Sequence, residues 1–141
     1  MEIRQVTEDF SVSPQIDAGD MTAIAAAGFK TVINNRPDSE VRAEQQSPAM
    51  QAAAEAVGLN YVLNPVVNGG LTLEMVTKQG APTAAADGPV LAWCRTGTRS
   101  ILTWALSQAG KRPTAEIVEM VARAGYDMPM LAQQIDMLAE R

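Results

Sequence analysis

The sequence predicts an α/β fold of three layers, in which a mostly parallel sheet lies between two layers of helices. Short β-branched runs alternate with helical segments along the whole chain. The run PVLAWC at 89–94 is apolar throughout, which is typical of a strand covered on both faces. A length of 141 residues suits one core of ordinary size, so we expect a single domain over 1–141.

The first half of the chain alternates strands with two helices. Pro14 favours an edge position for the first strand, because proline cannot donate a ladder hydrogen bond. Ser47 followed by Pro48 is the order that starts a helix, and the polar run RPDSE at 36–40 predicts a turn. The expected elements are an edge strand at 10–16, a helix capped by Asp17 and ended by Gly28, a strand at 29–35, a helix at 48–57 and a strand at 59–67.

The second half contains one strand and a series of helices. Gly80 and Pro82 both disfavour a helix interior, so they should end or kink the helix that Thr72 caps. The last helix has an apolar stripe that we expect to pack on the sheet, although this acidic, Met-containing tail could also form a homodimer face. The remaining expected elements are a strand at 89–94, a helix from Ser100 to Gly110, and helices at 115–124 and 129–139.

Composition and charge exclude several classes of function. A net charge of −5 and a pI of about 4.6 disfavour a nucleic-acid partner. One cysteine and no histidine rule out an intrachain disulfide, a Cys/His zinc site and a Ser-His-Asp triad. We find no apolar run near the roughly 18 residues of a membrane span, no secretory start and no dinucleotide or Walker pattern. We therefore expect a cytoplasmic protein with no membrane partner, no metal and no cofactor.

The stretch WCRTGTRS at 93–100 holds the strongest candidate site. It joins a buried strand to a helix, at the sheet edge where α/β folds bind ligands. The N–H groups of a tight loop and of a helix N-terminus can surround an anion and stabilise a thiolate. The predicted catalytic residues are Cys94 as nucleophile and Arg99 as a donor fork for an oxyanion. The predicted anion-binding loop consists of Arg95, Thr96, Gly97, Thr98 and Ser100.

A structural role is the alternative interpretation of Cys94. A lone cysteine at a strand end is often a small buried apolar residue, with Thr98 or Ser100 then acting only as a helix cap. The nucleophile hypothesis is preferred because loop, glycine, arginine and helix start follow one another in the required order.

Three further residues are candidates for the pocket around this loop. Arg36 and Asp38 follow a predicted strand end, where Arg36 could attract an anion and Asp38 could orient an arginine or donate a proton. A Pro-Asp turn with a solvated charge would explain the same residues. Asn68 follows the next strand along the chain. We expect the Arg95 side chain itself to point to solvent.

Three stretches of the chain resemble a known family. They are PVLAWCRTGTRSILTWAL at 89–106, KTVINNRPDSE at 30–40 and YVLNPVVNGGLT at 61–72. They are similar, in the same order, to the beta-lactamase-hydrolase-like, phosphatase-like domain family, whose members are often labelled sulfur transferases. The resemblance covers about residues 5–110 and implies the fold of the dual-specificity tyrosine phosphatases. It also implies Cys94 as nucleophile, with the 95–99 backbone and Arg99 as anion cradle.

The loop departs from the pattern of phosphatases with this fold. Those enzymes place five residues between cysteine and arginine, whereas four separate Cys94 from Arg99. Trp93 stands where they have histidine, and Asn68 stands where they have an aspartic acid that protonates the leaving group. An amide cannot do so. The short loop is similar instead to that of rhodanese-type sulfurtransferases, although no histidine is present for the rhodanese motif that follows the acidic turn.

These features favour a thiolate enzyme with a small anionic donor. The leading hypothesis is a sulfurtransferase that carries a persulfide on Cys94. The alternative is a phosphatase that works through a phosphocysteine. A second alternative is a non-catalytic module that binds an anion or a protein through the same loop.

Overall fold

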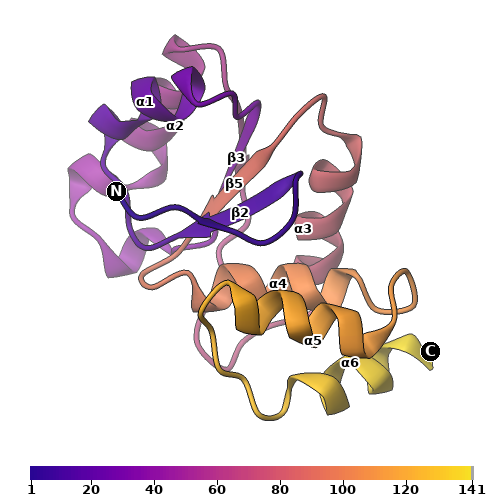
Figure 1. Cartoon of the computed structure of the whole chain (residues 1–141). Helices are drawn as coiled ribbons and strands as arrows, with labels where there is room; N and C mark the ends of the chain where they lie inside the picture. The colour runs from indigo at the N-terminus through magenta and orange to yellow at the C-terminus, as the bar shows by residue number, and fades with distance from the viewer. Residues whose placement is uncertain (141) are drawn as a thin grey trace.

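Five strands form one mixed sheet in the computed structural model, which describes residues 1–140 (Figure 1). The order across the sheet is β1-β2-β5-β3-β4, and β2, β5, β3 and β4 run parallel while β1 is antiparallel to β2. The central position of β5 places its C-terminal end in the middle of one sheet edge. The strands are Arg4–Gln5 (β1), Phe10–Ser13 (β2), Thr31–Asn34 (β3), Asn60–Leu63 (β4) and Val90–Trp93 (β5).

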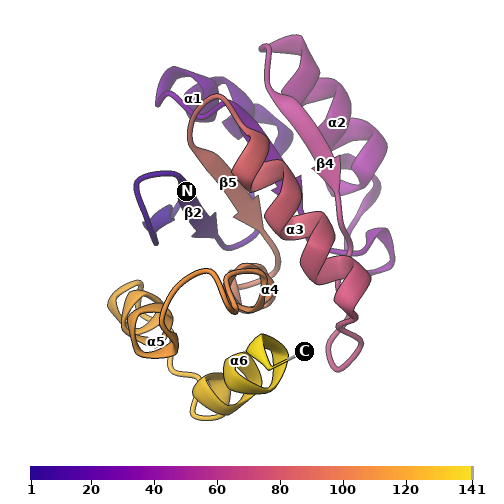
Figure 2. The same ribbon diagram turned by 90° about the vertical axis from the view of Figure 1, so that its right-hand side faces the viewer.

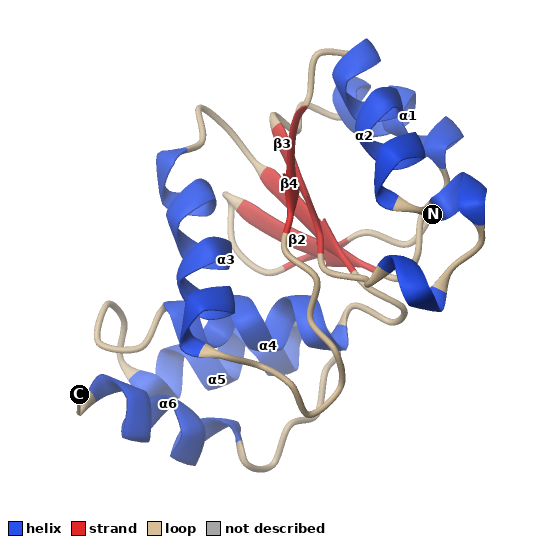
Figure 3. Cartoon of the chain, turned by 180° about the vertical axis from the view of Figure 1, so that it is seen from behind, coloured by secondary structure: helices blue, strands red, loops and turns tan. Residues whose placement is uncertain are grey.

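Helices cover both faces of the sheet. Figure 2 shows α1 and α2 on one side and α4, α5 and α6 on the other, with α3 beside α4. The same layers are visible from behind in Figure 3. The fold class predicted from the sequence is therefore confirmed. The helices are Met21–Ala26 (α1), Ser47–Ala56 (α2), Leu73–Ala85 (α3), Thr98–Ser107 (α4), Thr114–Arg123 (α5) and Leu131–Ala139 (α6), with short 3-10 turns at 18–20, 38–40 and 43–45.

Strand β5 packs into a different apolar cluster on each face. Val90 and Ala92 contact the cluster that includes residues of α4, α5 and α6. Leu91 and Trp93 contact the cluster formed with α1 and α2. All four side chains are fully buried, which confirms the prediction of a strand covered on both sides.

The edge position predicted for β2 is wrong. Residues Arg4–Gln5 add β1 outside it, so β2 is hydrogen-bonded on both sides. A strand of two residues carries no periodicity that sequence analysis could detect. Pro14 lies directly after β2, where its missing N–H costs no ladder bond.

Helix α3 does not end at Gly80, and it continues past Pro82 to Ala85. Gly80 is buried against α4, and a Cβ on it would lie 2.8 Å from the Cβ of Ser107. The glycine therefore permits the close approach of two helices instead of ending one. The prediction of an early end was wrong because this tertiary contact stabilises the segment more than local propensity disfavours it.

Two element boundaries also differ from the prediction. Helix α4 begins at Thr98, two residues before the predicted Ser100, and Gly97 caps it with a φ of +92°. Strand β4 ends at Leu63, so residues 64–72 form a connection to α3. The first difference shortens the loop after β5, and the second lengthens the connection after β4, at the sheet edge where the candidate site lies.

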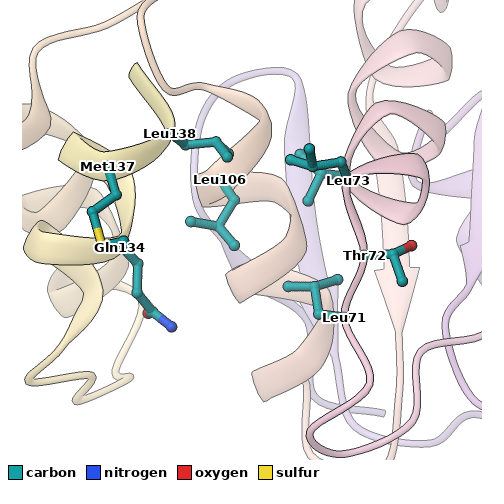
Figure 4. A pocket seen from close by; sticks show the side chains of 8 residues that line it. Leu71, Thr72, Leu73, Leu106, Gln134, Met137 and Leu138 are labelled. Atoms are coloured by element: carbon teal, nitrogen blue, oxygen red, sulfur yellow. The ribbon is translucent and has the colours of Figure 1, made fainter. Parts of the chain in front are cut away.

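Helix α6 packs on α4 and α5 through Leu131 and Ile135, which are buried. A pocket of about 310 Å³ lies where α6 meets α3 and α4. Figure 4 shows Leu73, Leu106 and Leu138, from these three helices, pointing into it. None of the helices within residues 1–140 has the length and apolar content needed to cross a bilayer.

Candidate active site

The site begins where β5 ends between two parallel neighbours. Trp93 is in register with both Ser13 of β2 and Asn34 of β3. The carbonyl of Trp93 accepts a hydrogen bond from the N–H of Asn35 at 2.9 Å. Cys94 therefore leaves the sheet at its centre, at the edge where parallel sheets bind ligands.

The loop after β5 turns a backbone donor toward the cysteine. Cys94 is fully buried, and its Sγ accepts a hydrogen bond from the N–H of Gly97 at 3.1 Å. Gly97 has a positive φ and its carbonyl accepts from the N–H of Ile101 at 3.0 Å, within the first turn of α4. Strand end, loop and helix N-terminus thus follow one another in the predicted order, and the loop places one backbone N–H against the sulfur atom.

The remaining loop residues divide into exposed and buried side chains. Arg95, Thr96 and Thr98 are exposed, and the hydroxyls of Thr96 and Thr98 are hydrogen-bonded to each other at 2.9 Å. The N–H of Thr98 donates to the Oγ1 of Thr96 at 3.3 Å. Ser100 is fully buried, and its hydroxyl has no hydrogen-bond partner among the described residues.

Arg99 is held by Glu40, which the sequence analysis did not single out. The Glu40 carboxylate accepts from both terminal nitrogens of Arg99, at 2.9 Å from Nη1 and 2.8 Å from Nη2. Nη1 also donates to the carbonyl of Val66 at 2.7 Å. The Arg99 side chain is 9% exposed, and these three bonds fix the orientation of its guanidinium.

The ion pair shifts the pKa of both partners. The hydrogen-bonded Glu40 raises the pKa of Arg99, and the negative charge of a Cys94 thiolate raises it further, while burial opposes both effects. The hydrogen bond from Arg99 lowers the pKa of Glu40, with help from the charges of Arg99 and Arg36 and against the effect of burial. Both groups are therefore charged at neutral pH.

Arg36 and Asp38 both have structural partners. Arg36 donates from Nε to the Glu40 carboxylate at 3.3 Å and from Nη1 to Gln15 at 3.1 Å. Asp38 accepts the N–H of Ser47 at 2.7 Å, at the start of α2. Arg36 thus reaches the site through Glu40, and Asp38 supports a helix N-terminus.

Asn68 lies exposed on the connection between β4 and α3. The same connection supplies the Val66 carbonyl to Arg99. Arg36, Asp38 and Asn68 remain predictions as pocket residues. The role proposed for Asp38, orienting an arginine, is performed in the structure by Glu40, two residues further along the same RPDSE run.

A buried network of three amides supports the site from behind. Asn35 donates to the Gln79 side chain at 2.8 Å and to the carbonyl of Asn64, also at 2.8 Å. Gln79 donates to Asn35 at 2.8 Å and to the carbonyl of Ser100 at 3.2 Å. Asn64 donates to Gln79 at 3.0 Å. The network connects the ends of β3 and β4 with α3 and the first turn of α4.

The fold and the position of this loop are those of a phosphatase-like domain. Residues 2–111 match the family described as beta-lactamase hydrolase-like protein, phosphatase-like domain. The chain belongs to this family, as the sequence resemblance implied.

Two relatives support the assignment along most of the chain. A beta-lactamase hydrolase-like protein of Xylella fastidiosa strain Temecula1 is 30% identical over 130 residues, which cover 91% of this chain. The chain spans only 30% of the length of that relative. A crystal structure of a proposed phosphatase from Neisseria meningitidis Z2491 is 31% identical, with a TM-score of 0.83, and the match covers 98% of this chain and 99% of that one.

A more distant structure supports the fold alone. PTPMT1 is 14% identical with a TM-score of 0.76, over 99% of this chain and 94% of its own. The tyrosine-phosphatase-like fold is thereby established. For the chemistry, the comparisons support the phosphatase alternative and give no support to the sulfurtransferase hypothesis that the sequence analysis preferred.

Proposed function

We propose that this domain hydrolyses phosphate monoesters through a covalent phosphocysteine at Cys94. The observation that carries the proposal is the contact between the Cys94 Sγ and the N–H of Gly97, at the N-terminus of α4 and within a phosphatase-like fold. A backbone donor and a helix N-terminus stabilise a thiolate and then the oxygens of a bound phosphoryl group. The buried Arg99 adds a fixed positive charge to the same region.

The reaction would proceed in two balanced steps. The Cys94 thiolate attacks phosphorus, a P–S bond forms, and the P–O bond to the leaving group breaks with its electron pair on oxygen. Water then attacks phosphorus, the P–S bond breaks, and inorganic phosphate leaves while the thiolate is restored. Both steps need an anion cradle and no bound cofactor.

The hydrogen bonds of Arg99 leave a defined pair of donors free. The two terminal nitrogens use one N–H each on Glu40, and the second N–H of Nη1 goes to Val66. Among residues 1–140 the Nε–H and the second N–H of Nη2 therefore have no partner, and they lie on the same side of the planar guanidinium. Such a pair matches two phosphoryl oxygens.

The substrate should have a leaving group that departs without protonation by a general acid. Asp38 and Glu40, the carboxylates of the RPDSE turn, already accept hydrogen bonds from Ser47 and Arg99. Asn68, where related phosphatases are expected to carry an acid, is an amide. We therefore infer that good substrates are aryl phosphate monoesters, whose leaving groups depart as stable anions.

A comparison of leaving groups tests this proposal. The purified protein is given a series of aryl phosphates of decreasing phenol acidity and one alkyl phosphate. We expect kcat/KM to fall steeply along the series, turnover of the alkyl ester to be undetectable, and Cys94→Ser to abolish all activity. Aryl phosphate turnover that persists in Cys94→Ser would contradict the mechanism, and no turnover in the unmodified protein would reject the function.

Sulfur transfer is the second candidate, and the spacing of the loop favours it. Four residues lie between Cys94 and Arg99, as in the rhodanese-type loop. Thiosulfate would give its outer sulfur to the Cys94 thiolate as the S–S bond breaks and sulfite leaves, and cyanide would then accept that sulfur as thiocyanate. Thiocyanate production that depends on Cys94, without aryl phosphate turnover, would make this the function. Inactivity in both assays would favour an anion- or protein-binding module.

A further inference from the structure

Tyr126 approaches the loop from a part of the chain that the family match does not include. It lies between α5 and α6, whereas the matched region ends at residue 111. Its hydroxyl donates a hydrogen bond to the carbonyl of Thr96 at 2.9 Å. A Cβ on Gly97 would overlap this hydroxyl, so the tyrosine and the loop backbone are in direct contact.

One peptide unit joins this hydroxyl to the nucleophile. The carbonyl of Thr96 and the N–H of Gly97 belong to the same peptide, and they point in opposite directions within its plane. Tyr126 binds the carbonyl end, and the Sγ of Cys94 binds the N–H end at 3.1 Å. A donor on the carbonyl oxygen polarises the peptide and strengthens its N–H as a donor.

The tyrosine ring is itself fixed in place. The guanidinium of Arg4 lies over the ring at 5.4 Å from its centroid. The same side chain donates to the carbonyl of Ala124 at 3.1 Å. The ring of Tyr126 is therefore held by a contact with Arg4 that would remain if the hydroxyl were removed.

We propose that Tyr126 is a positioning residue of the active site, which orients and polarises the Thr96–Gly97 peptide so that its N–H stabilises the Cys94 thiolate. The catalytic consequence rests on the phosphatase function proposed above. The Cys94 thiolate attacks phosphorus in the first step and is the leaving group when the phosphocysteine is hydrolysed. Tyr126 should therefore affect the rates of these two chemical steps.

The protonation state of Tyr126 agrees with a donor role. Burial raises the pKa of its hydroxyl, and the negative charges of Cys94 and Glu2 raise it further, while the positive charge of Arg4 opposes them. The hydroxyl therefore keeps its proton at neutral pH.

A kinetic comparison of two tyrosine variants tests the positioning role. Tyr126→Phe removes one hydroxyl and keeps the ring under Arg4. Tyr61→Phe is the matched control, because its hydroxyl bonds to Asn34 at the end of β3 and to Ser47 at the start of α2. We expect Tyr126→Phe to lower kcat for an aryl phosphate by about 5- to 10-fold, the effect of one hydrogen bond. The inhibition constant of inorganic phosphate should change less than about twofold, and Tyr61→Phe should leave kcat unchanged.

Three kinetic results would overturn the proposal. One is an unchanged kcat in a folded Tyr126→Phe protein. Another is an unchanged kcat with weaker phosphate inhibition and a lower melting temperature, which would indicate a purely structural role. The last is an equal loss of kcat in Tyr61→Phe. Circular dichroism establishes that each variant is folded.

An absorbance titration tests the contact without any turnover. The chain has two tyrosines, so in a Tyr61→Phe background the tyrosinate band reports Tyr126 alone. Removing the thiolate with Cys94→Ser should move this titration to lower pH. No shift would overturn the proposed proximity. A shift in a protein that hydrolyses no phosphate ester would instead reject the phosphatase function and retain the placement of Tyr126.

Discussion

At the scale of single residues, the site depends on how a buried arginine keeps its charge and its direction. Arg99 donates to the Glu40 carboxylate and to the Val66 carbonyl, and Arg36 donates to the Glu40 oxygen, Oε1, that Nη2 of Arg99 also binds. The sequence identified Arg99 from its place after Gly97. It could not identify Glu40, because the 59 residues that separate this pair leave no local pattern.

Replacing Glu40 should reduce catalysis more than it disturbs the fold. In Glu40→Gln the charge-assisted fork to Arg99 is lost, and such bonds contribute about 1.5–3 kcal/mol. If that orientation is needed in the transition state, kcat/KM for an aryl phosphate should fall by about 10- to 100-fold. Steady-state kinetics measure the effect.

Glu44 provides the matched control for this experiment. It pairs with Arg42 at 3.2 Å in the next turn of the chain, and both side chains are well exposed. Glu44→Gln should leave kcat/KM within about twofold, since exposed pairs contribute little. A similar loss in both variants would mean that a general charge effect is responsible.

The same carboxylate predicts how stability depends on pH. The pKa of Glu40 is lower in the folded protein than its usual value of 4.5. The stabilisation is therefore complete above 4.5 and is lost as pH falls through the folded-state pKa. The difference in unfolding free energy between the unmodified protein and Glu40→Gln should shrink in this range, as urea titrations at several pH values can measure. A difference that grows on acidification would contradict the shift.

At the scale of elements, the strands and helices that define the fold were predicted from hydrophobic periodicity, helix-capping residues and glycines. Strand β5 and helix α6 were predicted to within two residues at each end, because β5 is a continuous apolar run and α6 has a clear apolar stripe. Strand β1 and the second half of α3 were missed. Strand β1 depends on pairing with β2, and the second half of α3 depends on packing against α4. Local sequence propensity gives no information about such tertiary partners.

Gly80 gives a test of that explanation. In an isolated helix Gly80→Ala would be stabilising by about 1 kcal/mol. Here the new Cβ meets Ser107, and overpacking of this kind costs about 1–3 kcal/mol. We expect a net loss of unfolding free energy in urea denaturation, and a smaller loss when Ser107→Gly is added to the variant. Stabilisation by the single substitution would show that the two helices separate easily.

At the scale of the whole molecule, the C-terminal helices are part of the same core as the sheet. Ile117, Val121, Leu131 and Ile135 belong to the cluster that contains β2 and β5 residues. These helices lie beyond the region matched by the family, which ends at residue 111. They also bring Tyr126 to the loop, a contact that no motif around Cys94 could indicate.

Because α5 and α6 share one core with the sheet, shortening a buried side chain in α6 should destabilise the entire domain. Ile135→Ala should lower the unfolding free energy by about 2–5 kcal/mol in a single cooperative transition. Met137→Ala, on the same helix but 65% exposed, should change it by less than about 0.5 kcal/mol. Two separate transitions in thermal unfolding of the first variant would instead mark α5 and α6 as an independent unit.

The amide network behind the loop consists of Asn35, Asn64 and Gln79, none of which can gain or lose a proton. Its hydrogen bonds are therefore the same in acid as in alkali, whereas the pairing of Glu40 with Arg99 exists only while the carboxylate is ionised. Acidification below pH 4.5, through the lowered folded-state pKa of Glu40, should consequently release the arginine from a scaffold that is still assembled, so that the domain passes through a folded and inactive form before it unfolds.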